Sequence, residues 1–134
     1  MNRTLLERAL QTRSEALGYR FCCAAEEYLP QSVSAYPAAW LKPPQLHAIE
    51  GRTGGRISFD VTLHLLHNGA RLAAVARAQA WETMEEHLIN IFTNLSNDPG
   101  VIAVEGLTIR PRTYALSNHG EISQTAEARV ITFF

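Results

Sequence analysis

The chain has 134 residues, of which 46% are hydrophobic and 19% charged, enough apolar material for one core and therefore for a single domain, residues 1–134. Twelve Lys and Arg against thirteen Asp and Glu give a formal net charge of -1, which argues against a general nucleic-acid-binding protein. The sequence has no apolar run near the roughly 18 residues of a membrane span, no apolar signal core, and only the adjacent cysteines Cys22 and Cys23. These features predict a protein of a reducing, intracellular compartment that is neither secreted nor inserted in a membrane.

The first residues predict a short helix followed by a short strand. Thr4-Leu5-Leu6-Glu7 has the form of a capping box, and leucines recur at helical spacing until Gly18 supplies a stop. We expect this helix to extend from Thr4 to Leu17. Alternation between Tyr19 and Leu29 then predicts a strand.

Four prolines punctuate the next segment, which predicts a long irregular loop. Pro30, Pro37, Pro43 and Pro44 surround Tyr36, Trp40 and Leu41, and proline interrupts a hydrogen-bond ladder. Loops of this length are often functional, and exposed aromatic side chains are common interface anchors. The sequence leaves two readings open. Either Tyr36 and Trp40 form a contact surface, or both fold back to cover an open end of the sheet.

A β-hairpin is the clearest local signal in the sequence. Leu46–Arg52 and Arg56–Leu66 read as its strands, joined by a tight turn at Thr53-Gly54-Gly55. Alternation along the second strand predicts one buried and one solvated face. The buried face would carry Ile57, Phe59, Val61, Leu63 and Leu65, and the solvated face Ser58, Asp60, Thr62 and His64.

The second half of the chain predicts one long helix and then two or three strands. Residues 70–97 are rich in helix formers and end at Asp98-Pro99-Gly100. Pro111 and residues 118–120 would interrupt the closing strands, the last of which covers about residues 121–133. The apolar stripe of the helix consists of Trp81, Met84, Leu88, Ile91, Phe92 and Leu95. We therefore predict an α+β fold: a single antiparallel or mixed sheet with one long and one short helix packed on one face.

The sequence carries no recognised catalytic or metal-binding motif. The five histidines do not share a ligand spacing, since His64 and His67 would face opposite sides of a strand. Cys22 and Cys23 read as packing residues among alanines. The acidic trio at positions 82, 85 and 86 reads as a solvated helix flank. We predict no enzyme activity, no catalytic residue, no metal and no cofactor.

Two arginine-containing segments could contact a partner. Gly51–Arg56 superficially resembles a phosphate-binding loop, but it lacks the Lys-Ser/Thr ending and precedes a strand, so a hairpin turn is the better reading. Arg110-Pro111-Arg112 could meet an acidic surface or could be ordinary solvated charge. The residues that we expect at a protein interface are Tyr36, Trp40, Leu41, Arg52, Arg56, Arg110 and Arg112.

The order of the predicted elements resembles that of the tailed-phage tail terminator and tail-completion (minor tail) proteins of prophage type. The resemblance covers nearly the whole chain and rests on its size, the opening helix, the hairpin, the long helix and the closing strands. Three short stretches also resemble strand sequences of that group: residues 57–63 (ISFDVTL), 119–121 (HGE) and 130–134 (VITFF).

This resemblance implies a homo-oligomeric ring, commonly hexameric, without a catalytic centre. Such a ring caps the tail tube and presents a surface to the neck or head-tail connector proteins, in the virion tail or in the cytoplasm of the bacterial host. It gives a use to edge strands and loop aromatics, because each subunit of a ring offers two different patches. The long last strand, if it lay at a sheet edge, could be extended by another chain.

Two other functions remain open. One is a small-ligand-binding or enzymatic α+β domain with a pocket between sheet and helix. The other is a generic protein-interaction adaptor.

Overall fold

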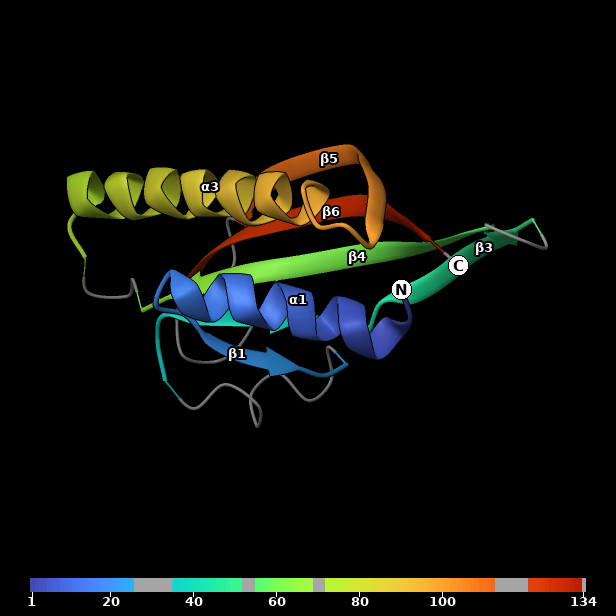
Figure 1. The fold of residues 1–134 in the computed structure, drawn as a ribbon. Helices are drawn as coiled ribbons and strands as arrows, with labels where there is room; N and C mark the ends of the chain where they lie inside the picture. Colours follow the sequence, from blue (N-terminus) through green and yellow to red (C-terminus); the bar gives the residue numbers. More distant parts are fainter. Residues whose placement is uncertain (26–34, 52–54, 69–71, 113–120, 134) are drawn as a thin grey trace.

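Two helices and one mixed sheet make up the computed structural model, which describes residues 1–25, 35–51, 55–68, 72–112 and 121–133 (Figure 1). The predicted α+β class is confirmed, with a six-stranded sheet. The elements in chain order are α1 (Arg3–Ala16), β1 (Arg20–Cys23), β2 (Ala38–Leu41), β3 (Gln45–Glu50), β4 (Arg56–His67), α3 (Ala74–Ser96), β5 (Val101–Arg112) and β6 (Ile122–Phe133).

Strand β4 organises the sheet. The strand order is β1-β2-β4-β6-β5, and β3 pairs with β4 as well. β6 pairs antiparallel with all of β4, so β2 and β3 must share the opposite edge. β2 takes residues 63–66 of that edge and β3 takes residues 56–60. Only β1 and β2 are parallel, which makes the sheet mixed.

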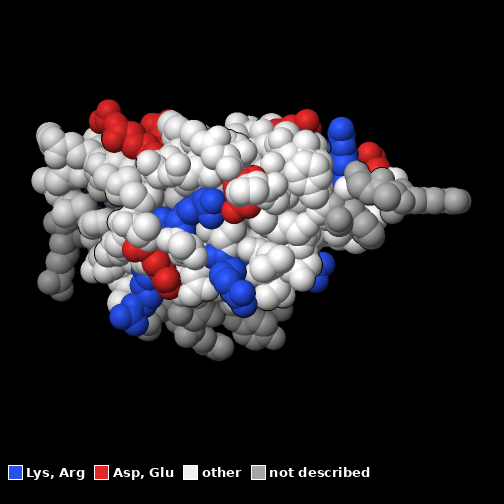
Figure 2. All heavy atoms as spheres, viewed as in Figure 1, with Lys and Arg blue, Asp and Glu red and all other residues white. Residues whose placement is uncertain are grey.

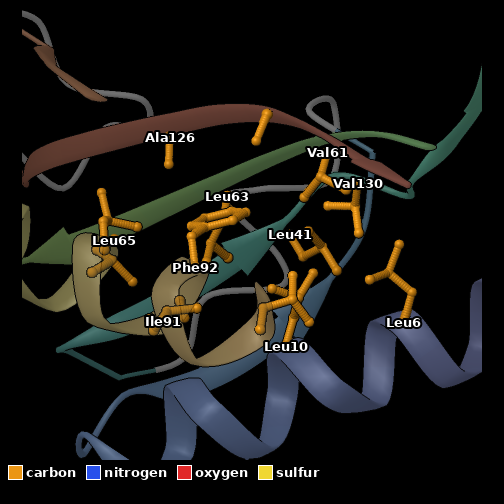
Figure 3. Packing of buried hydrophobic residues seen from close by; sticks show 14 of the residues in the cluster. Leu6, Leu10, Leu41, Val61, Leu63, Leu65, Ile91, Phe92, Ala126 and Val130 are labelled. Atoms are coloured by element: carbon orange, nitrogen blue, oxygen red, sulfur yellow. The ribbon is translucent and has the colours of Figure 1, made fainter. Parts of the chain in front are cut away.

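Both helices cover the same face of the sheet, and the main core lies between them and the strands (Figures 1 and 3). The predicted alternation in β4 is confirmed on this face, where Phe59, Val61, Leu63 and Leu65 are buried. Full burial of such side chains stabilises the fold by roughly 1.5–3 kcal/mol each. They meet Leu6 and Leu10 of α1, Leu41 of β2, Ile91 and Phe92 of α3, and Ala126 and Val130 of β6.

The first helix begins one residue earlier than predicted and is not closed by a capping box. Asn2 is its N-cap, and the Asn2 side-chain oxygen accepts a hydrogen bond from the Leu5 N–H at 2.8 Å. Asparagine caps a helix at least as well as threonine. The capping-box prediction on Thr4 and Glu7 is therefore wrong, although the predicted stop holds: Gly18 has φ +90° just past the helix end.

The long helix is confirmed, with a later start than predicted. It covers Ala74–Ser96, and of its predicted stripe five side chains are buried and Trp81 is half-buried. After Asn97 the chain turns sharply, since the Asp98 carboxylate accepts a hydrogen bond from the Gly100 N–H at 2.9 Å. The predicted break at residues 98–100 is therefore correct.

The proline-rich segment was wrongly predicted as irregular throughout. Residues 38–41 form β2, which is completely buried and paired on both edges, to β1 and β4. Proline interrupts a ladder only where it stands within the strand. Pro37 precedes β2 while Pro43 and Pro44 follow it, so four consecutive residues keep their N–H groups.

Two predictions about the closing strands also need correction. Pro111 does not end a strand but lies inside β5, opposite Gln124. β5 is the last strand of the sheet, and proline is tolerated on an edge strand. β6, in turn, lies between β4 and β5 and is not available for extension by another chain.

Both strands of the hairpin are confirmed, while its turn at residues 52–54 lies outside the described residues. The predicted interruption of the closing strands at residues 118–120 also lies outside them. β3 ends at Glu50, two residues earlier than predicted. Gly51 follows it with φ +83°, a conformation that favours glycine.

Two leucines of the hairpin provide a direct test of where the core ends. Leu63→Ala in β4 removes a fully buried side chain and should lower the free energy of unfolding by about 2–5 kcal/mol. Leu46→Ala in β3, where the side chain is 47% exposed, should cost less than about 1 kcal/mol. Urea denaturation followed by circular dichroism measures both changes. Equal losses of unfolding free energy would contradict the finding that Leu63 lies in the core and Leu46 outside it.

Candidate functional site

Six of the seven residues expected at an interface are described by the structure, and they lie in three different environments. Trp40 and Leu41 are buried in β2, and Tyr36 is half-buried. Arg56 is exposed at the start of β4, whereas Arg110 and Arg112 stand at the end of β5. Arg52 lies outside the described residues. The structure thus brings Arg110 and Arg112 together but not the whole set.

Trp40 and Leu41 are core residues, which corrects the prediction that they form an exposed contact. Leu41 points toward the helices, while Trp40 points to the opposite side of the sheet. There the indole packs with Ala38 and Leu66, and its N–H donates to the Ala24 carbonyl at 2.8 Å. The second reading is therefore correct for Trp40: the aromatic ring covers part of the sheet instead of binding a partner.

His64 faces Trp40 on this side of the sheet and is completely buried, not solvated as predicted. The two rings stack with centroids 4.8 Å apart and planes 20° apart. His64 Nδ1 shares a hydrogen bond of 2.7 Å with the Thr125 hydroxyl, whose oxygen also accepts from Arg112 Nε at 3.3 Å. Arg112 is therefore attached to a buried network and is not simply a solvated charge.

Burial keeps the His64 imidazole neutral. Burial, with Arg112 and then Lys42 as further causes, lowers the pKa of His64 from 6.5 to about 3. Protonation would place a buried imidazolium beside the cations Arg112 and Lys42, and none of the causes of the shift is a compensating carboxylate. The packing of His64 against Trp40 on this side of the sheet therefore requires an uncharged imidazole.

The rest of this sheet face is polar and uncovered by helices. The Arg129 guanidinium donates to the Asp60 carboxylate at 3.1 Å, and His47 Nδ1 lies 3.7 Å from the same carboxylate. Register places Glu105 and Glu127 on the same face, and these charges surround a hollow of about 620 Å³. Its lining includes three carboxylates, of Asp60, Glu105 and Glu127, and the guanidinium groups of Arg110 and Arg129, so charges of both signs border it.

The hairpin end of the molecule exposes apolar side chains that sequence reasoning missed. We use "hairpin end" for β3 with residues 55–57 of β4. Leu46 is 47% and Ile49 is 52% exposed, although register places them beside Phe59 and Ile57 on the face that helices cover elsewhere. β3 makes its main contacts with β4 alone. The sequence predicts a strand over Leu46–Arg52, but nothing local indicates that the helices stop short of it.

Cysteine and metal chemistry find little support within the described residues. Desolvation and the neighbouring Glu7 carboxylate raise the pKa of the Cys23 thiol to about 11, which disfavours the reactive thiolate at neutral pH. No three His, Cys, Asp or Glu side chains in the described part of the chain converge as metal ligands. Neither described helix has the length and apolar character needed to cross a membrane.

No protein-family model matches the chain, and no curated protein matches it significantly. Function must therefore be inferred from the residues and their geometry.

Acid should destabilise the protein through His64. Between about pH 6.5 and pH 3 the unfolded chain binds a proton that the folded chain excludes, so stability falls as the pH is lowered. The expected slope is about 1.4 kcal/mol per pH unit within this window. His64→Phe keeps a ring against Trp40 and should flatten the pH dependence of the free energy of unfolding.

His67→Phe is the matched control, because His67 is a half-exposed neighbour on the same strand. Urea titrations at several pH values measure the slope, which is independent of any constant loss caused by the substitution. An unchanged slope in His64→Phe would show that other groups control acid stability.

Proposed function

We propose that the protein is a structural subunit of a phage or prophage tail, a tail-terminator or tail-completion protein that forms a homo-oligomeric ring, caps the tail tube and contacts the neck or head-tail connector. The supporting observation is the hairpin end. It presents Leu46 and Ile49 on a sheet face whose remainder is covered by helices. Exposed apolar side chains that continue a core surface are typical of a protein contact site.

The arrangement of the fold agrees with this proposal. The opening helix, hairpin, long helix and closing strands occur in the order on which the resemblance to tail terminators rests. Copies of such a subunit would supply the cover that the hairpin end lacks. The buried Trp40 has no part in this contact, so Trp40→Ala would test the core and not assembly.

A small-ligand-binding domain is the second candidate, and one feature favours it. A hollow of about 390 Å³ lies where α3 meets β5 and β6, close to the predicted pocket between sheet and helix. A thermal-shift screen with metabolites and divalent metals tests this candidate, because a ligand that binds only the folded state raises the melting temperature.

The assembly proposal predicts a discrete closed oligomer, most informatively a hexamer with a central opening. Light scattering after size exclusion, over a wide concentration range with and without magnesium, gives its mass, and electron microscopy shows its shape. The double substitution Leu46→Ser and Ile49→Ser should shift the protein toward smaller species, since it removes apolar contact area.

Leu107→Ser is the control for this substitution. Leu107 is 36% exposed, but it lies on β5 and outside the hairpin end. The contact site is wrong if both variants weaken assembly equally. A strict monomer whose melting temperature rises with a small molecule would favour the ligand-binding candidate instead.

A further inference from the structure

The hollow where α3 meets β5 and β6 has apolar walls and an acidic rim. Ala78, Trp81 and Pro111 supply the walls, while Glu82 and Glu85 stand beside them on the exposed side of the helix. Figure 2 shows acidic side chains gathered over the N-terminal half of α3, at the upper left. Neither carboxylate forms an ion pair with another described residue.

The polar groups of this hollow that lack partners are acceptors. Gln124 lines it and is only 4% exposed; the Gln124 amide N–H₂ donates to the Trp81 carbonyl at 3.1 Å, which leaves its buried Oε1 atom without a partner. The Trp81 indole N–H is already used, because it donates to the Ser123 carbonyl at 3.2 Å. An aromatic ring, two carboxylates and an amide oxygen together favour a cationic hydrogen-bond donor.

A surface of the opposite character lies at the other end of the sheet. β4 runs from Arg56 at the hairpin end to His67, and β6 pairs with it so that Gln124 lies opposite Leu65 (Figure 1). The hollow and the hairpin end are thus separated by most of the length of β4. Within the described residues of the hairpin end, the charged side chains are Arg56 and Glu50, which lie opposite each other in the register, so any excess of positive charge comes from neighbouring residues.

More cations stand close to the hairpin end. Arg3 and Lys42 line a second hollow, of about 510 Å³, together with Leu46. This end therefore combines exposed apolar side chains with positive charge, while the Trp81 hollow combines apolar walls with negative charge. The two surfaces are complementary in both respects.

We propose that the hairpin end of one copy docks into the Trp81 hollow of a second copy, with the Arg56 guanidinium facing Glu82 and Glu85. The inference rests on the proposed assembly function and names the surface that receives the hairpin. Because the two surfaces differ and lie at opposite ends of the chain's sheet, the contact is heterologous. Repetition of a heterologous contact gives a ring when the rotation closes and a filament when it does not.

Charge reversal on each surface tests the contact. One variant carries Glu82→Arg and Glu85→Arg, and the other carries Arg56→Glu. We expect each to weaken self-association at least about tenfold, as measured by sedimentation velocity over a range of concentrations, because each places like charges opposite one another. All three positions are exposed, and circular dichroism with thermal melting verifies that the variants fold.

Two matched controls lie outside the contact. Glu86→Arg reverses an exposed carboxylate on the same helix that does not line the hollow, and Arg8→Glu reverses an exposed arginine on α1. Both should associate within about twofold of the wild type. A general dependence on net charge would move the controls and the test variants alike and would overturn the specific contact.

Mixing the two test variants gives the decisive result. The Glu82/Glu85 variant retains an intact hairpin end, and the Arg56 variant retains an intact hollow, so the mixture should recover association in a 1:1 ratio. A mixture that stays as weak as its components overturns the inference.

The remaining outcomes separate this inference from the proposed function. Undiminished oligomers of the Glu82/Glu85 variant would overturn the hollow as the receiving surface and leave assembly itself standing. A wild type that is monomeric at every concentration would overturn both self-docking and the homo-oligomeric ring.

Discussion

The different burial of the two halves of β4 is the constraint on which the rest of the structure depends. In its second half both faces are enclosed, because Leu63 and Leu65 meet the helices while His64 lies under Trp40. In its first half β3 is the neighbour on one edge, and the helices give β3 little cover. One strand therefore connects a tightly packed end to an exposed end. The neutral His64 imidazole lies at the packed end, and the surface that we propose for assembly lies at the exposed end.

The elements that sequence reasoning located correctly are those with long periodic patterns. Strand β4 and the apolar stripe of α3 carry enough repeats for the buried face to be read directly. β2 was missed because its four residues are flanked by prolines, and a strand that short has no periodicity of its own. The burial of His64 was missed for a related reason. Alternation assigns a side chain to a face, but whether that face is wet depends on residues distant in sequence, such as Trp40, which stacks on the His64 ring.

The candidate site was only partly predictable. Sequence reasoning chose Trp40 because aromatic side chains anchor interfaces, yet the same large apolar area makes tryptophan a good core residue, and composition cannot separate the two roles. Arg56 was found through the hairpin turn. The Trp81 hollow was not, since it forms from helix α3 and from strands that follow it by some 30 to 40 residues in the sequence. The acidic flank of α3 was noticed, but its meaning depends on Gln124 and Pro111 lying beside it.

The irregular pairing of β5 restricts the direction in which copies can add. Its register to β6 shifts between Glu105 and Thr108, where Gly106 has φ +63°, and Pro111 lacks the N–H that a further strand would need. Bulges and prolines on an edge strand oppose the edge-to-edge pairing of strands from different copies that leads to amyloid-like fibres. A subunit that assembles with its own copies, as we propose for this protein, would gain from this protection. In such an assembly, strand pairing between copies at β5 would be disfavoured. Copies would then add at the ends of the strands and not at the β5 edge.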